Sequence, residues 1–246
     1  MNRYKRILII TDNREITEKF IKEVLPVVEE DVEFEFACSP TSDINVIEDF
    51  YFRNINLKND QIVEELIAAK DLIISLHCKQ LFPVKLISNI KCINVHPGYN
   101  PINRGWFPQV FAIVNNIDIG ATIHEIDEKL DNGNIISRSK VEKYCYDTSS
   151  SLYERVINEE LRLLKESINS IVNNNYKAFK PEGSGNLYLK RDFQELCKLN
   201  LDEKCTMGEA INKLRALTHG DYKNAYYFDK AGNKIFVSLN IELKKE

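Results

Sequence analysis

The chain has 246 residues, of which 43% are hydrophobic and 28% are charged, so it is long enough to bury the core of a globular protein. A formal net charge of −4 argues against a nucleic-acid-binding protein, and the six cysteines form neither a CxxC pair nor a zinc-binding spacing. The first apolar run is too short for a signal peptide or a membrane span, which predicts a cytoplasmic protein with reduced thiols and no membrane partner.

The first half of the chain alternates between strand-like and helix-like patterns. Apolar or alternating runs predict strands at residues 6–10, 32–37, 71–76 and 92–96. Amphipathic or capped segments predict helices after Asp12 or Asn13 and at residues 60–69, 83–88 and 106–115. Residues 41–52 are weakly patterned, and we interpret them as a short helix that leads into a loop. No GxGxxG follows the first strand, so the dinucleotide-binding fingerprint is absent.

The second half begins with two more strands and a long helix. Residues 120–127 alternate strictly, with Thr122 and His124 on one face, and residues 134–143 predict a further strand. Residues 149–151 supply a cap for a helix over residues 152–173. A polar stretch rich in Pro, Gly and Asn follows, and we place a boundary there, between an N-terminal domain of residues 1–180 and a C-terminal subdomain of residues 181–246.

The C-terminal subdomain carries shorter patterns. Residues 187–190 predict a strand, residues 207–217 a helix, and residues 226–228 and 234–240 a hairpin. Because strands alternate with helices before this point, the predicted fold class is α/β, a doubly wound and mainly parallel sheet followed by a small α+β subdomain.

The most informative stretch is CINVHPGYNPINRGWFPQ, at residues 92–109. Side chains two apart on a strand share a face, so Asn94 and His96 should project together where the strand ends at Pro97. In open α/β sheets, ligands bind at the carboxyl ends of the strands. We therefore expect a functional site here, covered by a polar loop that carries Asn103 and Arg104.

The series Asn94-x-His96, the polar loop and then GATIHEIDEKLDNG with Asp131 resembles the active-site series of 10-formyltetrahydrofolate-dependent formyltransferases. The resemblance covers roughly residues 7–142. The 18 residues NVHPGYNPINRGWFPQVF resemble the sugar N-formyltransferase branch, which acts on nucleotide-linked amino-deoxysugars. The resemblance implies catalytic roles for Asn94, His96 and Asp131, 10-formyltetrahydrofolate as co-substrate, and a homodimer.

The residue types suit formyl transfer. An amine attacks a formyl carbon, and the Asn94 amide on a rigid strand can stabilise the oxyanion that develops. A base with a pKa near neutrality must deprotonate the amine, which suits His96. Asp131 can orient the imidazole or relay protons, although an Asp before Asn-Gly is also an ordinary turn former. The sequence predicts no metal site, because the four histidines show no ligand spacing.

Further site residues follow from the resemblance and from residue type. Two segments resemble those that cradle the pterin, with candidate residues Lys79, Leu81, Phe82, Pro83, Ile126, Asp127 and Gly133. For the nucleotide sugar, the polar loop offers Tyr99, Asn103, Arg104 and Trp106. Aromatic rings can stack on a base and cations can meet a pyrophosphate, which adds Tyr188, Lys190, Arg191, Tyr222 and Asn224 from the C-terminal part. The alternative for this part is an ordinary subdomain with aromatic packing, and for Trp106 a packing role.

The resemblance implies formyl transfer to a dTDP-linked amino-dideoxysugar, for surface glycans such as the O-antigen of lipopolysaccharide. It favours dTDP-4-amino-4,6-dideoxyglucose, with the 3-amino isomer next. Three alternatives stay open: a methionyl-tRNA formyltransferase, a glycinamide ribonucleotide formyltransferase, and a non-catalytic protein that binds nucleotide sugars or folate. The acidic chain lacks an evident basic tRNA-binding domain, and binding alone does not demand Asn94, His96 and Asp131 together.

Overall fold

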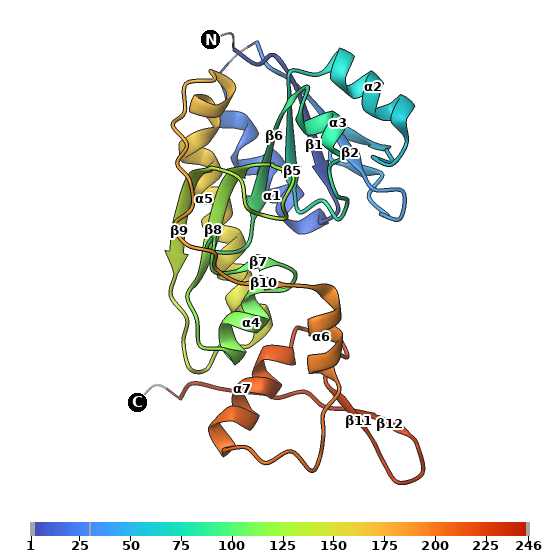
Figure 1. The fold of residues 1–246 in the computed structure, drawn as a ribbon, viewed down its shortest axis with the longest axis vertical. Coiled ribbons are helices and arrows are strands. Elements are labelled where there is room, and N and C mark those ends of the chain that lie inside the picture. Colours follow the sequence, from blue (N-terminus) through green and yellow to red (C-terminus); the bar gives the residue numbers. More distant parts are fainter. Residues whose placement is uncertain (1–2, 30, 245–246) are drawn as a thin grey trace.

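The computed structural model describes residues 3–29 and 31–244, which form a large α/β body and a smaller C-terminal part (Figure 1). An eight-stranded sheet runs in the order β3-β4-β2-β1-β5-β6-β8-β9. Its strands are β1 (Arg6–Thr11), β2 (Glu33–Cys38), β3 (Val46–Ile47), β4 (Phe50–Asn54), β5 (Leu72–Leu76), β6 (Lys91–His96), β8 (Ile119–Glu125) and β9 (Ile135–Val141). The five adjacent strands β4, β2, β1, β5 and β6 are mutually parallel, whereas β3, β8 and β9 pair antiparallel with their neighbours. The predicted fold class is confirmed.

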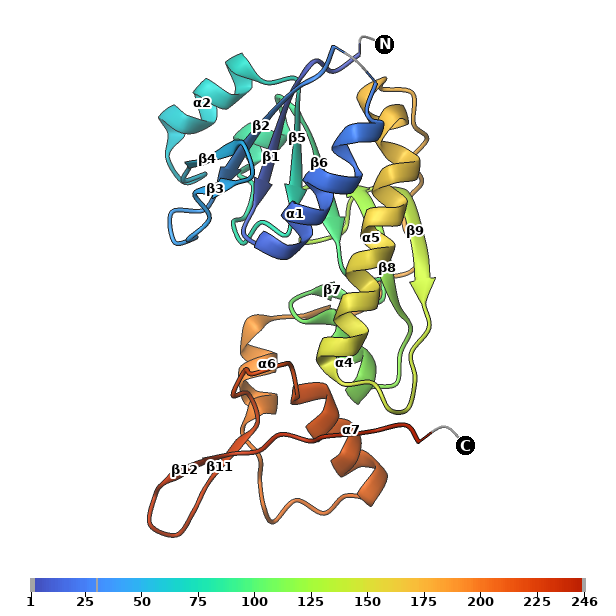
Figure 2. The same cartoon turned by 180° about the vertical axis from the view of Figure 1, so that it is seen from behind.

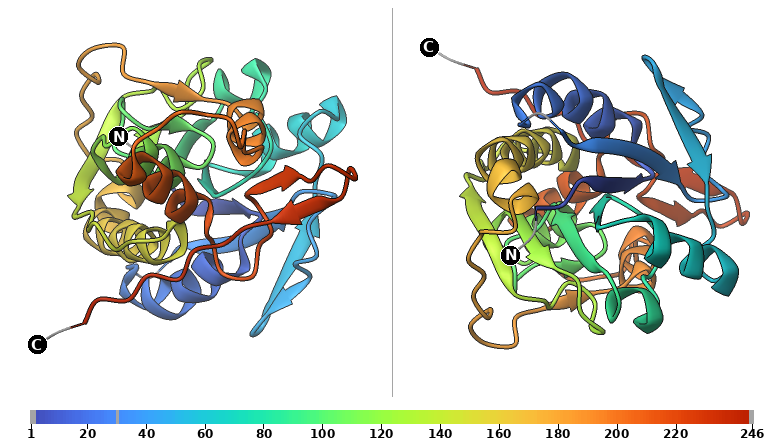
Figure 3. Two further views of the ribbon diagram at one scale, coloured as in Figure 1. Left: turned by 90° about the horizontal axis from the view of Figure 1, so that it is seen from below. Right: turned by 90° about the horizontal axis from the view of Figure 1, so that it is seen from above.

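Helices cover both faces of the sheet. They are α1 (Arg14–Glu23), α2 (Asp60–Ala69), α3 (Val84–Ile87), α4 (Pro108–Val114) and α5 (Ser149–Val172), with a 3₁₀ turn at Leu25–Val27. Figures 2 and 3 show α1 and α5 on one face and α2 and α3 on the other. Alternate strand residues divide accordingly, since Ile9 packs in the cluster with α1 and α5, whereas Ile10 packs in the cluster with α2 and α3. None of the described helices is long and apolar enough to cross a membrane.

Several local features differ from the sequence predictions. Residues 41–52 do not form a helix, because the aromatic and β-branched side chains of this segment pair as β3 and β4 at the edge of the sheet, with Phe52 opposite Phe36 of β2. Helix α5 is capped by Thr148 and begins at Ser149, so residues 149–151 are its first turn. The sequence analysis also missed α6 (Lys190–Cys197).

The C-terminal part consists of α6, α7 (Met207–Leu217) and a hairpin of β11 (Tyr226–Phe228) and β12 (Lys234–Phe236), which ends sooner than predicted. Ala216 and Leu217 of α7 share a buried cluster with Val110 of α4 and Leu152 of α5. The buried Arg215 guanidinium donates to the carbonyl oxygen of Asp147 at 2.7 Å, just before α5. These contacts hold the C-terminal part against the first turn of α5. The predicted domain boundary at residue 181 stays a prediction.

The connection between the two parts crosses the loop that follows β6. There β10 (Leu187–Tyr188) pairs with β7 (Arg104–Gly105), as Figure 1 shows. The backbone N–H of Asn186 donates to Pro101, and its carbonyl accepts from Arg104. Gly185 has a left-handed φ of +58°, and its Cα lies so close to Pro101 that an added Cβ would fall 1.7 Å from the Pro101 carbonyl oxygen. We call this connection, residues 185–188, the strap, because it packs against the loop after β6 and holds it in place.

This close approach predicts that Gly185→Ala destabilises the protein more than Gly183→Ala. Both positions have a positive φ, which costs an alanine roughly 1–2 kcal/mol. A Cβ at Gly183 would meet no atom of the described residues within 4 Å, so the Gly183→Ala variant measures the cost of the backbone conformation alone. The clash at Gly185 should add about 1–3 kcal/mol to the loss in the free energy of unfolding, measured by urea titration. Equal losses in the two variants would contradict the close packing of the strap.

Candidate active site

A cleft of about 760 Å³ lies at the carboxyl ends of the central parallel strands. Its walls come from the segments after β1, β5 and β6, from the first turns of α4 and α5, and from the C-terminal part. Among the residues that line it are Asn94, His96, Asp131, Lys79, Leu81, Trp106, Tyr222 and Asn224. The sequence analysis placed a site at this edge of the sheet, and the structure brings these predicted residues into one cleft.

Asn94 and His96 lie next to each other in this cleft because they alternate on β6 with Ile93 and Val95, which face α1 and α5. The antiparallel neighbour β8 places His124 directly opposite Asn94 and Thr122 opposite His96. Four polar side chains thus share one face at the junction of two strands, and three of them are buried.

Asp131 connects these side chains. The Asn94 amide donates to Asp131 Oδ1 at 3.0 Å, and the backbone N–H of Gly105 donates to Oδ2 at 2.9 Å. His96 Nδ1 lies 3.7 Å from Oδ2, and His124 Nε2 lies 3.6 Å from Oδ1. Burial by itself would raise the pKa of Asp131, but the charge that the two histidines carry when protonated, together with the Gly105 N–H, holds that pKa well below its usual range. The group is therefore a carboxylate.

The proton positions of the two histidines follow from their backbone partners. His96 Nε2 donates its proton to the Asn103 carbonyl at 2.8 Å, which leaves Nδ1, on the Asp131 side, as the basic nitrogen of the neutral ring. His124 Nδ1 donates to the Glu125 carbonyl at 2.7 Å, so Nε2 accepts from the Asn94 amide at 3.2 Å. His96 can thus take up a proton next to a fixed negative charge.

The loop after β6 is held by Thr122, which is fully buried. Its hydroxyl donates to the Gly98 carbonyl at 2.6 Å and accepts from the Asn100 N–H at 3.1 Å. The Asn100 amide donates in turn to the Asp131 carbonyl at 2.9 Å. A Cβ on Gly98 would lie 2.4 Å from His96 Nε2, so the loop packs directly on the imidazole.

The other residues predicted to bind the pterin of the folate lie outside the cleft lining. Phe82 and Ile126 pack against the buried cluster on the α2 and α3 face. Asp127 accepts from Lys129 and Asn132 within its own turn. Gly133 is pressed against the Glu125 carbonyl, and Pro83 caps α3. These residues shape the two segments that border Lys79, Leu81 and Asp131.

Of the residues predicted to bind the nucleotide sugar, Trp106, Tyr222 and Asn224 line the cleft, whereas the others do not. Asn103 is buried and uses its side chain to accept from the Tyr99 N–H, and Arg104 donates to Asn132 and to the Ser184 carbonyl. Tyr99 lies under Arg138.

Of the predicted cluster after the boundary, Tyr188 stacks on Phe111 with ring centroids 4.0 Å apart. Lys190 lies over Trp106, and Arg191 pairs with Asp192. None of these three side chains lines the cleft, although Lys190 contacts Trp106, which does.

The sequence analysis missed several cleft residues. His124, which contacts Asn94 and Asp131 from behind the cleft lining, was placed on one face of its strand with Thr122 but given no role. Gln109, Ser149, Tyr153, His219 and His77 also line the cleft. The sequence analysis interpreted Ser149 as part of a helix cap, did not single out Gln109 or Tyr153, and gave the two histidines no individual role. One feature of the sequence could have pointed to His77. Glu160 is a charged residue on the otherwise apolar face of α5, and in the structure it is fully buried next to His77. Among the described residues, no group of three or more His, Cys, Asp or Glu side chains has the arrangement of a metal site.

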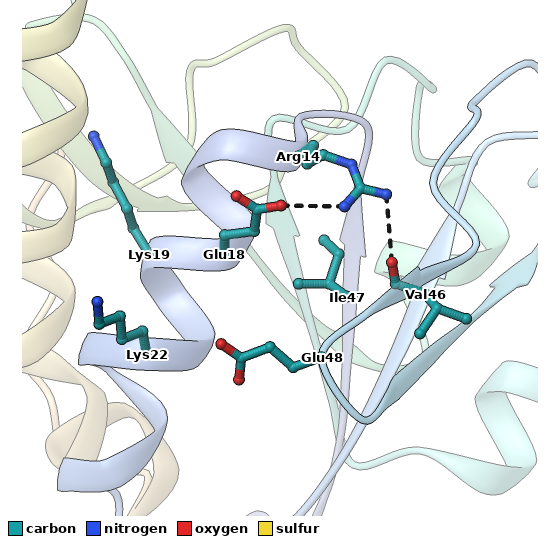
Figure 4. Close-up of a pocket in the computed structure, with 7 residues that line it drawn as sticks. All are labelled: Arg14, Glu18, Lys19, Lys22, Val46, Ile47 and Glu48. Atoms are coloured by element: carbon teal, nitrogen blue, oxygen red, sulfur yellow. Dashed lines mark hydrogen bonds and ion pairs between the residues drawn. The ribbon is translucent and has the colours of Figure 1, made fainter.

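A second hollow lies between α1 and β3, outside the cleft (Figure 4). Arg14 donates there to Glu18 at 3.1 Å and to the Val46 carbonyl at 3.3 Å, and Lys19 donates to Glu15 at 2.9 Å. The charges mainly pair with their neighbours on the same helix. None of the predicted site residues lies in this hollow, so we place the chemistry in the cleft.

Comparison with known proteins agrees with this geometry. Residues 12–168 match the formyl transferase family, and residues 192–243 match the N-formyltransferase dimerization C-terminal domain. The chain belongs to the formyl transferase family. It is thus a formyltransferase, and the resemblance found in the sequence is confirmed.

Similar proteins lie in the sugar N-formyltransferase branch of this family. The chain is 46% identical over 183 residues to the dTDP-4-amino-4,6-dideoxyglucose formyltransferase of Mycobacterium tuberculosis, which covers 74% of this chain and 78% of that protein. A solved 4-N formyltransferase from Francisella tularensis has a TM-score of 0.90 and 40% identity, over 98% of this chain and 99% of that one. A sugar N-formyltransferase from Shewanella sp. has a TM-score of 0.91 and 38% identity, over the same fractions.

The role of Thr122 predicts a marked difference between two substitutions. Thr122→Val keeps the shape of the side chain but leaves the Asn100 N–H and the Gly98 carbonyl without their buried partner. The free energy of unfolding should fall by about 2–4 kcal/mol. Thr122→Ser keeps the hydroxyl and should lose only about 1 kcal/mol for the missing methyl group. If the valine variant unfolds in urea at the same midpoint as the serine variant, this hydroxyl does not hold the loop.

Proposed function

We propose that this formyltransferase transfers the formyl group of 10-formyltetrahydrofolate to the amino group of a dTDP-linked amino-dideoxysugar, with dTDP-4-amino-4,6-dideoxyglucose as the favoured acceptor. The observation that carries the chemistry is the convergence of Asn94, His96 and Asp131 in one cleft at the end of β6. The choice of acceptor is supported by the relative at 46% identity, which is named for that sugar nucleotide. The product would enter surface-glycan synthesis.

His96 acts as the base in this proposal. Its Nδ1 carries the free electron pair, because Nε2–H is committed to the Asn103 carbonyl. Nδ1 removes a proton from the amine as the nitrogen bonds to the formyl carbon, and the Asp131 carboxylate, 3.7 Å away, stabilises the imidazolium. The same proton then reaches the departing folate nitrogen when the tetrahedral intermediate collapses.

Asn94 stabilises the oxyanion in this proposal. Both of its N–H groups have partners in the structure, Asp131 at 3.0 Å and His124 at 3.2 Å. An N–H must therefore leave one of them to reach the developing charge. The contact with His124 is the longer and involves a neutral acceptor, so we infer that this N–H turns to the oxyanion while the bond to Asp131 keeps the amide in place.

The folate would occupy the side of the cleft formed by Lys79, Leu81 and Leu130. The Leu81 side chain is 78% exposed beside this site, and an apolar ring system would cover it. Phe82 and Ile126, although outside the lining, hold the two bordering segments against the sheet. Backbone groups of these segments, including Asp127 and Gly133, are then the ones that meet the pterin.

The nucleotide would extend toward the C-terminal part. Tyr222 is 72% exposed and lines the cleft together with Trp106 and Asn224, so its ring is available to stack on the base. We also propose a homodimer. Its support is the match of residues 192–243 to a dimerization domain and the exposed apolar side chains of Phe228, Ile235 and Phe236 on the terminal hairpin.

The proposed function predicts one formylated product. The purified protein is incubated with 10-formyltetrahydrofolate and a panel of dTDP- and UDP-linked 3-amino and 4-amino sugars, and products are identified by mass. A gain of one formyl group on dTDP-4-amino-4,6-dideoxyglucose, dependent on the folate, is expected. Turnover confined to methionyl-tRNA or glycinamide ribonucleotide, or none with any amine, would refute the proposal.

The role of His96 predicts that His96→Asn lowers turnover by ~10²–10⁴-fold, the range typical for loss of general acid–base catalysis. Binding of the nucleotide sugar and of the folate, each followed by calorimetric titration, should change little, because asparagine removes the imidazole without adding charge or bulk to the cleft. Near-normal turnover in the variant would show that another group takes the proton.

A further inference from the structure

His77 has an unusual backbone conformation at the end of β5, with a left-handed φ of +58°. Leu76 faces the α1 and α5 side of the sheet, so strand alternation would send the next side chain to the opposite face. The left-handed turn instead brings the imidazole to α5, where its Nε2 lies 2.9 Å from both oxygens of Glu160. A non-glycine residue in this conformation costs of order 1–3 kcal/mol and is typical of functional sites.

Glu160 is the second unusual feature, because its side chain is fully buried. Among the described residues, His77 is the one hydrogen-bond partner recorded for this carboxylate. A buried pair of this kind contributes little to stability, since apolar residues of similar volume serve as well or better. The pair is therefore poorly explained as a structural device.

Asn13 determines where the His77 proton lies. The Asn13 Oδ1 atom accepts from the Ile16 N–H at 3.3 Å as the cap of α1, which turns its N–H₂ group toward His77. That group lies 3.3 Å from His77 Nδ1 and 3.0 Å from the Tyr153 hydroxyl. Because an amide nitrogen only donates, Nδ1 accepts, and the ring carries its proton on Nε2 and donates it to Glu160.

The end of this chain of contacts is the Tyr153 hydroxyl, 3.1 Å from His77 Nδ1 and on the wall of the cleft. Burial, followed by the charge of Glu160, raises the pKa of Tyr153, so the hydroxyl stays protonated. Its proton is directed at His77 Nδ1 and one lone pair accepts from Asn13, so the other lone pair can accept a hydrogen bond from a ligand, whereas a negative charge lies behind it. This chemistry suits a neutral hydroxyl of a ligand and disfavours a phosphate.

We propose that Tyr153 binds a ring hydroxyl of the acceptor sugar and that His77, Asn13 and Glu160 position it. The proposal rests on the function proposed above. β5 and β6 are neighbouring parallel strands with Leu76 opposite Val95, so His77 and His96 leave the sheet side by side. Adjacent strands lie about 4.8 Å apart, and both Tyr153 and His96 line the same cleft. An amine at His96 therefore brings the other ring substituents toward Tyr153.

The test compares wild type and Tyr153→Phe with dTDP-4-amino-4,6-dideoxyglucose and with its 2-deoxy and 3-deoxy analogues. Phenylalanine keeps the ring that packs edge-on against His219 and removes only the hydroxyl. We expect KM for the sugar nucleotide to rise roughly tenfold with kcat within about threefold. One analogue should show the same rise with wild type and no further rise with the variant. Tyr51→Phe, on an exposed strand outside the cleft, is the matched control and should leave KM unchanged.

A second pair of variants tests the positioning residues. Glu160→Gln keeps an oxygen that accepts from His77 Nε2, so KM should stay within about threefold of wild type, whereas Glu160→Met should reproduce the rise seen with Tyr153→Phe. An unchanged KM in Tyr153→Phe, or losses that multiply for both analogues, would overturn the assignment while the proposed function stands. Failure of wild type to formylate any dTDP-linked amino sugar would overturn both.

Discussion

The carboxylate of Asp131 is the group around which the active site is assembled. It is buried and charged, and such a group is tolerated only where hydrogen bonds and positive or polar neighbours compensate the lost hydration. Its partners come from three separate segments: Asn94 from β6, His124 from β8, and the Gly105 N–H from the loop before α4. None of these segments can move away without leaving the charge exposed to an apolar interior. The chemistry and the local stability therefore depend on the same contacts.

The antiparallel strand β8 is what makes this assembly possible. The parallel strands deliver Asn94 and His96 to the edge of the sheet, but another parallel neighbour would bring its own carboxyl end to that edge. Because β8 runs the other way, its residues pass beside Asn94 and His96 in the register that sets His124 and Thr122 opposite them. A shift by one residue would turn both side chains to the α1 and α5 face. The chain then turns at Asp131, so that the carboxylate returns to the end of β6.

Much of this could be predicted from the sequence, because it depends on local patterns. The spacing of two between Asn94 and His96, the alternation around His124 and the helix at residues 60–69 are properties of short segments, and the structure has them as expected. The pairing of His77 with Glu160 spans 83 residues and needs a left-handed backbone angle that no pattern indicates. Conversely, Tyr188, Lys190 and Arg191 are a cluster in the sequence only, because β10 ends beside them and α6 begins, sending the tyrosine to Phe111 and the lysine to Trp106.

Two buried carboxylates, Asp131 and Glu160, lie beyond the ends of the neighbouring strands β6 and β5, and each lies next to a histidine. Behind β6, Asp131 faces an imidazole whose free nitrogen points toward it, and this is the nitrogen that acts as the base in the proposed mechanism. Behind β5, Glu160 accepts from the protonated nitrogen of His77, which leaves Nδ1 facing Asn13 and the Tyr153 hydroxyl. In the proposed mechanism, the same pair of residue types supplies a base on one strand and positions a binding contact beside the next. Since both strands belong to one parallel sheet, their separation is set by backbone hydrogen bonds and is independent of the loops above. Tyr153, the proposed sugar contact, lies on α5, so its distance from His96 depends on how that helix packs against the sheet.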